Sequence, residues 1–126
     1  MRLVLAILAA LSIASPAFAE EYEKGPNGGL MLDVAGIDAE LLTSGNTVTI
    51  NVFEAFSPKP ISTKGYAAAV LIVSGANREP LTLTQWDENS LKGEAKKPIP
   101  SDAMITLMIK TAHGKFGQVR FKVGER

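Results

Sequence analysis

The side chains best suited to chemistry are three methionines and one histidine. These residues are Met31, Met104, Met108 and His113. Thioether sulfur binds Cu(I), and imidazole binds copper and zinc. In an extended strand Met104 and Met108 lie on one face, and His113 follows that strand. A copper or zinc site is therefore one hypothesis; the alternative is that the flexible methionines fill space beside an apolar core.

An enzymatic site has little support in the sequence. His113 lies in a predicted hairpin turn, and as a general base it would need a nucleophile and an orienting acid beside it. The chain has no G-x-S-x-G motif, and the absence of cysteine removes thiolate catalysis and cysteine-based metal sites. We therefore predict a protein that is not an enzyme and needs no cofactor, with copper or zinc bound only under the metal hypothesis.

Three aromatic residues are candidates for contact with a protein partner. Phe53 falls on the polar face of a predicted strand, Phe56 follows that strand, and Trp86 ends a later one. Aromatic side chains on a sheet surface anchor partners, although in a β-domain they also cover the end of the core. The partner hypothesis requires these three side chains to be exposed.

The first 19 residues have the form of a cleavable export signal. Arg2 precedes an apolar run over residues 3–13, and Ala17-Phe18-Ala19 has the A-x-A form of a cleavage site. The run is shorter than the roughly 20 residues that span a bilayer. We expect residues 1–19 to be removed, leaving no membrane span, a flexible lead-in over 20–29 and one periplasmic domain over 30–126.

Charge and composition exclude several classes of protein. Without Arg2 the chain carries 12 basic and 13 acidic side chains, a net charge of −1, which gives no electrostatic basis for binding nucleic acid. The lack of cysteine means that no disulfide stabilises the fold. Stability must therefore come from an apolar core.

Short segments of β character follow one another along the domain. Residues 47–54 alternate most clearly, with Val48, Ile50 and Val52 on one face. Residues 66–74 are the most apolar; their β-branched end favours a strand, and three alanines leave a short helix as the alternative. The predicted strands are 30–35, 37–43, 47–54, 66–74, 80–85, 90–95, 103–111 and 115–123. About eight short strands predict an all-β, immunoglobulin-like sandwich.

Pro26-Asn27-Gly28-Gly29 is the most distinctive short string. An N-G pair with adjacent glycines is typical of a turn; the alternative is an anion-binding loop, without the helix that usually follows one. The string Gly25–Gly29 and the later Glu40-Leu41 resemble small secreted proteobacterial proteins of unknown function, which begin with G-P-H-G-G before a short E-L strand. Further matching segments are Lys59-Pro60-Ile61, Thr63-Lys64-Gly65, Leu81-Thr82-Leu83 and Arg120-Phe121.

A similar H-G-G…E-L segment resembles part of the periplasmic adaptor subunits of heavy-metal efflux pumps, which implies a role in metal handling. Asn27, however, stands at the position of the histidine, and an amide is a poor ligand for soft metals. We therefore expect a non-enzymatic periplasmic binding or accessory module that contacts a protein or envelope component. Periplasmic handling of copper or zinc is the alternative.

Overall fold

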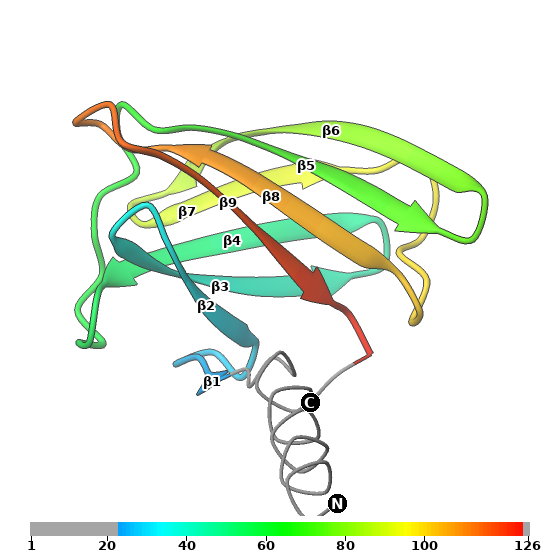
Figure 1. Cartoon of the computed structure of the whole chain (residues 1–126), viewed down its shortest axis with the longest axis horizontal. Helices are drawn as coiled ribbons and strands as arrows, with labels where there is room; N and C mark the ends of the chain where they lie inside the picture. Colours follow the sequence, from blue (N-terminus) through cyan, green and yellow to red (C-terminus); the bar gives the residue numbers. More distant parts are fainter. Residues whose placement is uncertain (1–22, 125–126) are drawn as a thin grey trace, which may run out of the picture.

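The computed structural model describes residues 23–124, and this part of the chain consists of β-strands joined by turns and loops (Figure 1). The strands are β1 (Glu23–Lys24), β2 (Leu30–Val34), β3 (Ile37–Ser44), β4 (Thr47–Glu54), β5 (Ala67–Ser74), β6 (Asn77–Asp87), β7 (Ser90–Glu94), β8 (Met104–Lys110) and β9 (Phe116–Lys122). Within residues 23–124 there is no helix that could cross a membrane. The predicted export signal, residues 1–19, lies outside the described residues.

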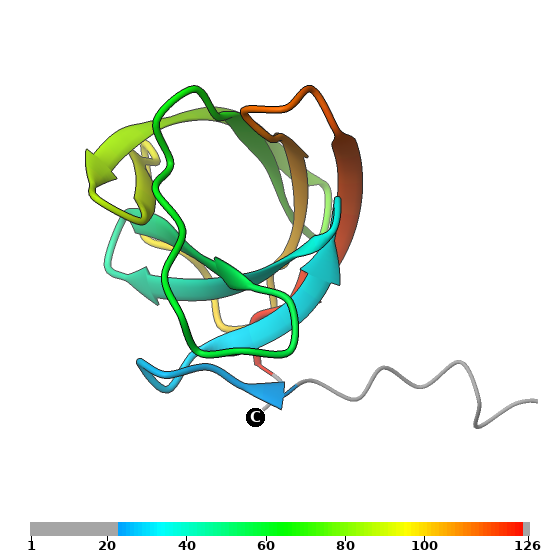
Figure 2. The same ribbon diagram turned by 90° about the vertical axis from the view of Figure 1, so that its left-hand side faces the viewer.

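All nine strands belong to one antiparallel sheet with the order β1-β2-β3-β4-β7-β6-β5-β8-β9. The sheet curls until its two halves face each other, as Figure 2 shows from one end. The result is a half-barrel, so the predicted all-β class is confirmed. An immunoglobulin-like sandwich is not confirmed, because β6 pairs with both β5 and β7 and joins the two halves into one sheet.

β6 passes from one half of the sheet to the other. Its residues Asn77–Leu83 pair with β5, and the register with β7 begins at Thr84 and shifts between Gln85 and Asp87. A bulge of this kind bends a strand and increases its twist. The first part of β6 has an unpaired edge, where a proline such as Pro80 is tolerated because it has no N–H to donate.

Each of the eight predicted segments overlaps one strand, although β6 extends beyond the predicted 80–85 at both ends, and residues 67–74 form β5, not a helix. One strand was not predicted: β1 lies in the segment expected to be a flexible lead-in, and it pairs with β2. The core fills the inside of the curled sheet. Its fully buried apolar side chains come from both halves and include Val48, Ile50, Val52, Val70, Leu91, Ile105, Leu107, Ile109 and Phe121.

Candidate functional site

The outer face of β3 carries a fully buried carboxyl group, Glu40. Its Oε2 accepts the backbone N–H groups of Asn27 at 2.8 Å and Gly29 at 2.9 Å. Its Oε1 accepts the side-chain amides of Asn27 at 2.9 Å and Asn51 at 3.3 Å. A carboxylate has about four acceptor positions, so all of them are used inside the protein.

The turn that covers Glu40 is the Gly25–Gly29 string. It is closed by hydrogen bonds from Gly28 N–H to Gly25 O at 2.9 Å and from Gly25 N–H to Gly29 O at 2.8 Å. The prediction of a turn is thus confirmed. The Gly25–Gly29 turn and Glu40 form a structural unit, in which the turn donates hydrogen bonds and the glutamate accepts them.

The polar contacts continue across the sheet from Glu40. Asn51 lies opposite Glu40 in the register of β3 with β4, and Ser90 lies opposite Asn51 in that of β4 with β7. The Ser90 hydroxyl donates to Asn51 Oδ1 at 2.6 Å. This row of satisfied buried groups fixes the register of three strands, and it leaves Glu40 no acceptor position for a metal ion.

The four proposed metal ligands lie on three elements of the structure: β2, β8 and the β8–β9 turn. Met31 is on β2 beside an acidic hollow, and Met104 lines a different hollow between β2 and β9. Met108 is half-buried on β8, and His113 is exposed in the β8–β9 turn. Among residues 23–124, no three His, Asp or Glu side chains are arranged to hold a metal ion. The copper or zinc hypothesis, which rests mainly on methionine sulfur, stays a prediction.

The three aromatic candidates differ in exposure. Phe53 is only 4% exposed and packs within the protein, so it cannot anchor a partner directly. Phe56 is 94% exposed and Trp86 is 66% exposed. The Trp86 ring already has a cationic neighbour, because Lys92 Nζ lies 4.1 Å from its centroid. Phe56 is the aromatic side chain that lies most open to a partner.

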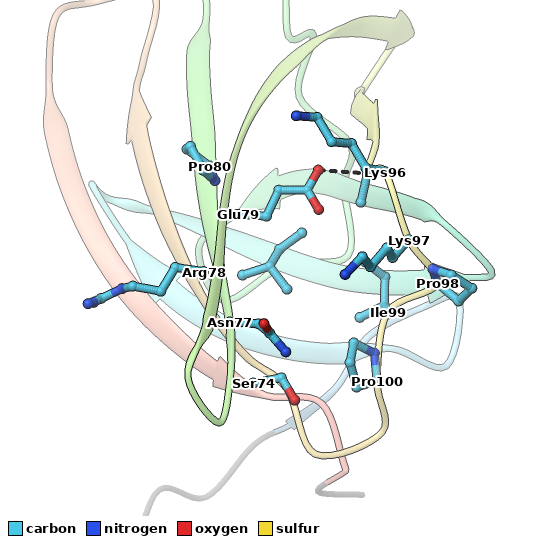
Figure 3. Close-up of a pocket in the computed structure, with 12 residues that line it drawn as sticks. Ser74, Asn77, Arg78, Glu79, Pro80, Lys96, Lys97, Pro98, Ile99 and Pro100 are labelled. Atoms are coloured by element: carbon cyan, nitrogen blue, oxygen red, sulfur yellow. Dashed lines mark hydrogen bonds between the residues drawn. The ribbon is translucent and has the colours of Figure 1, made fainter.

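A groove lies between the unpaired edge of β6 and residues 95–100, and its volume is about 360 Å³ (Figure 3). Its apolar lining comes from Ile72, Pro80, Ala95, Pro98, Ile99 and Pro100. Its polar lining comes from Ser74, Asn77, Arg78, Glu79, Lys96 and Lys97. We call this feature the β6 groove.

Hydrogen bonds hold residues 95–100 in place as one wall of the β6 groove. The Lys96 N–H donates to Glu79 Oε2 at 2.8 Å, the contact drawn in Figure 3. On the other side, Ala95 N–H donates to Asn46 O and Ile99 N–H to Gly45 O in the β3–β4 turn. The groove is therefore preformed, and Lys96 and Lys97 give its wall a positive charge.

A second feature, at the β2–β3 hairpin, is a pair of aspartates. The two hairpin-loop residues, Ala35 and Gly36, have φ values of 53° and 80°, as a type I′ turn requires. This turn sets Asp33 directly opposite Asp38 on the outer face. Asp38 is only 5% exposed, so two carboxyl groups are held together with one of them buried.

Burial, together with a hydrogen bond and charge repulsion from the neighbouring Asp33, raises the pKa of Asp38 from 3.8 to about 6, against a smaller lowering by the Phe56 N–H. A carboxyl whose pKa is higher in the folded state than its ordinary value of 3.8 binds its proton more tightly when folded. The stability from this tighter binding is present below about pH 4 and is lost as the pH rises through 6.

We expect Asp38→Asn to remove this loss. The variant should be more stable than the wild type at pH 7.5 by roughly 1–3 kcal/mol and nearly equal to it at pH 4. Urea unfolding at the two pH values measures the difference. The exposed Asp87→Asn substitution is the control and should change neither value by more than about 0.5 kcal/mol; an Asp38→Asn protein that is less stable at pH 7.5 contradicts the interpretation.

The sequence reasoning missed the β6 groove and the aspartate pair. The aspartate pair had a signal, since a two-residue turn at Ala35-Gly36 sets the register that brings Asp33 opposite Asp38. The groove had none, because β6 and residues 95–100 meet only when the sheet curls. Comparison with protein families, curated proteins and solved structures finds no match to this chain.

Proposed function

We propose that the chain is a non-enzymatic binding module of the periplasm, and that it holds an extended segment of a protein partner in the β6 groove. The observation that carries the proposal is the composition of this groove: a preformed apolar lining beside the two lysines Lys96 and Lys97. Ligand sites are typically concave and mostly apolar, with volumes of about 300–1,000 Å³ and a few polar groups that set specificity. The export signal expected at residues 1–19 supports the periplasm.

The charges of the groove favour an acidic partner segment. Lys96 and Lys97 follow each other on one wall, whereas Glu79 is already engaged by the Lys96 N–H at 2.8 Å. Arg78 points away from residues 95–100 in Figure 3 and contributes less. A segment with glutamate or aspartate between apolar residues therefore complements the groove.

The edge of β6 shapes how such a segment is held. Residues 77–83 have no strand partner on the groove side within the described part of the chain, and an unpaired edge invites strand addition. Pro80 removes one donor from the strand, which works against a continuous ladder with an added chain. Recognition by side chains in the groove is thus favoured over plain strand addition.

The test is a binding measurement with a defined probe, the fluorescein-labelled heptapeptide of alternating leucine and glutamate. We expect saturable binding by the purified protein, weakened about tenfold or more by the double substitution Lys96→Glu with Lys97→Glu, because attraction becomes repulsion. Fluorescence anisotropy gives both affinities, and rising salt should weaken the binding.

The matched control is the double substitution Lys64→Glu with Lys110→Glu. Both lysines are exposed and neither lines the groove, and the net charge changes by the same amount. This control should bind the peptide like the wild type. Neither the wild type nor the control should bind a peptide with lysine in place of glutamate. Equal weakening in both double variants would show that net charge, and not the groove, governs binding, and the proposal would fail.

A further inference from the structure

The aspartate pair lies in a hollow on the outer face, away from the β6 groove. Its lining includes Glu23, Met31, Asp33, Asp38 and Phe56. Three of these side chains are carboxylic acids from β1, β2 and β3. Among residues 23–124, no lysine or arginine lines the hollow, so each of the three strands that form it contributes a negative charge.

One oxygen of the buried aspartate is unsatisfied. Asp38 Oδ1 receives no hydrogen bond from a donor within the described part of the chain, and the residue is 95% buried; the Asp38 carboxyl has the Asp33 carboxyl beside it as a hydrogen-bonding neighbour. A buried acceptor without a donor is rare in folded proteins, and each case calls for an explanation. Asp38 lines the hollow, and a donor that arrives with a ligand would satisfy this oxygen.

Phe56 supplies an aromatic ring beside the carboxyl groups. It is 94% exposed, and its backbone has a positive φ of 64°, a strained conformation for a residue with a large side chain. Such strain persists where the surrounding structure holds it, and it is concentrated at binding and active sites. Phe56 lines the hollow, and its exposed side chain does not pack against the core.

From these observations we infer that the hollow is a socket for an arginine side chain of a protein partner. Guanidinium is planar, carries several N–H donors in a fork that matches carboxylates, and stacks on aromatic rings. It would donate to Asp38 and Asp33 while lying against Phe56. A metal ion fits less well, because no three acidic side chains among residues 23–124 are arranged to hold one.

The socket goes beyond the function proposed for the β6 groove and is independent of it, since the two features share no residue. The two surfaces are expected to bind partner side chains of opposite charge: acidic side chains in the β6 groove and a basic side chain in the hollow. Either can fail in experiment without the other.

The experiment is an NMR titration of the ¹⁵N-labelled protein with the peptide acetyl-Gly-Arg-Gly-amide. The neutral isostere acetyl-Gly-citrulline-Gly-amide is its control. We expect the arginine peptide to shift the amides of Asp33, Asp38 and Phe56 in a saturable manner at pH 7.5. The citrulline peptide should shift them at least tenfold less at the same concentration.

Two variants and a change of pH sharpen the test. Phe56→Ala and Asp38→Asn should each weaken binding at least fivefold, whereas Phe116→Ala, which removes another exposed ring, should not. Binding should also weaken at pH 5, because Asp38 is then protonated; the groups that face it are Asp33 on β2, Glu23 on β1 and the N–H of Phe56. Since Asp38→Asn is expected to stabilise the fold at neutral pH, its loss of binding cannot be ascribed to unfolding.

Three outcomes would overturn the inference. The first is an equal response to the arginine and citrulline peptides, and the second is the absence of saturable shifts at these amides up to about 50 mM peptide, far above the millimolar weak end of the affinity scale. The third is a saturable shift of the same amides by calcium chloride that the arginine peptide does not reproduce, which would assign the hollow to a cation.

Discussion

Replacing Glu40 with alanine is expected to lower the free energy of unfolding by roughly 3–5 kcal/mol. The substitution removes the acceptor of four hydrogen bonds, from the Asn27 backbone and side chain, the Gly29 backbone and the Asn51 side chain. Each buried donor left unsatisfied costs about 1–3 kcal/mol, and the turn over β3 loses the group that holds it. Urea unfolding followed by circular dichroism measures the change.

Two further variants separate the hydrogen bonds from the loss of a carboxyl group in general. Glu40→Gln keeps one oxygen but places an amide N–H₂ against the remaining donors, so we expect an intermediate loss of stability. Glu94→Ala removes an exposed carboxyl on β7 and should change stability by less than about 0.5 kcal/mol. A Glu40→Ala protein within 1 kcal/mol of the wild type would contradict the structural role assigned to this group.

Gly29→Ala is expected to destabilise the protein by about 3 kcal/mol or more, and Gly28→Ala by only about 1 kcal/mol. A Cβ at Gly29 would overlap the backbone oxygen of Leu41 and lie 2.8 Å from Leu42 Cδ2. Backbone on β3 cannot move aside without breaking the sheet. At Gly28 a Cβ meets nothing within 4 Å, so its cost is that of the positive φ of 83°.

Thermal unfolding of the two variants checks this order. Both substitutions replace one glycine of the same turn by alanine, so they change the unfolded chain alike, and the difference reports close packing in the folded state. An equal loss at the two positions would mean that the turn does not press against β3 as described.

Local pattern was enough to predict most of the strands. Val48, Ile50 and Val52 alternate with polar residues, and glycine and proline mark the ends of the segments, so the all-β class follows from the chain itself. The curling of the strands into one sheet could not be predicted from the chain. It depends on β6, which pairs with both β5 and β7 and bends at the register shift between Gln85 and Asp87. A bulge leaves no reliable local signal, and without it two separate sheets are the simpler expectation.

The candidate sites were harder to predict than the strands. Phe53 shares its face of β4 with polar residues, and this pattern predicts an exposed side chain. In the structure the outer face of the sheet is covered at this position, and Phe53 is buried. Glu40 has the sequence context of a solvent-facing strand residue, and only the turn over it makes it part of the interior. The β6 groove joins residues 77–80 to 95–100, a juxtaposition that tertiary structure alone creates.

The most direct test of the proposed function is an NMR map of where the labelled protein meets the peptide of alternating leucine and glutamate. We expect saturable shifts, with one common dissociation constant, at Arg78, Glu79, Lys96 and Ile99, and none at Asp38 or Phe56. Shifts that cluster elsewhere, or no saturable shift at peptide concentrations up to about 5 mM, above the weak end of the affinity scale, would contradict the claim that the β6 groove binds the partner.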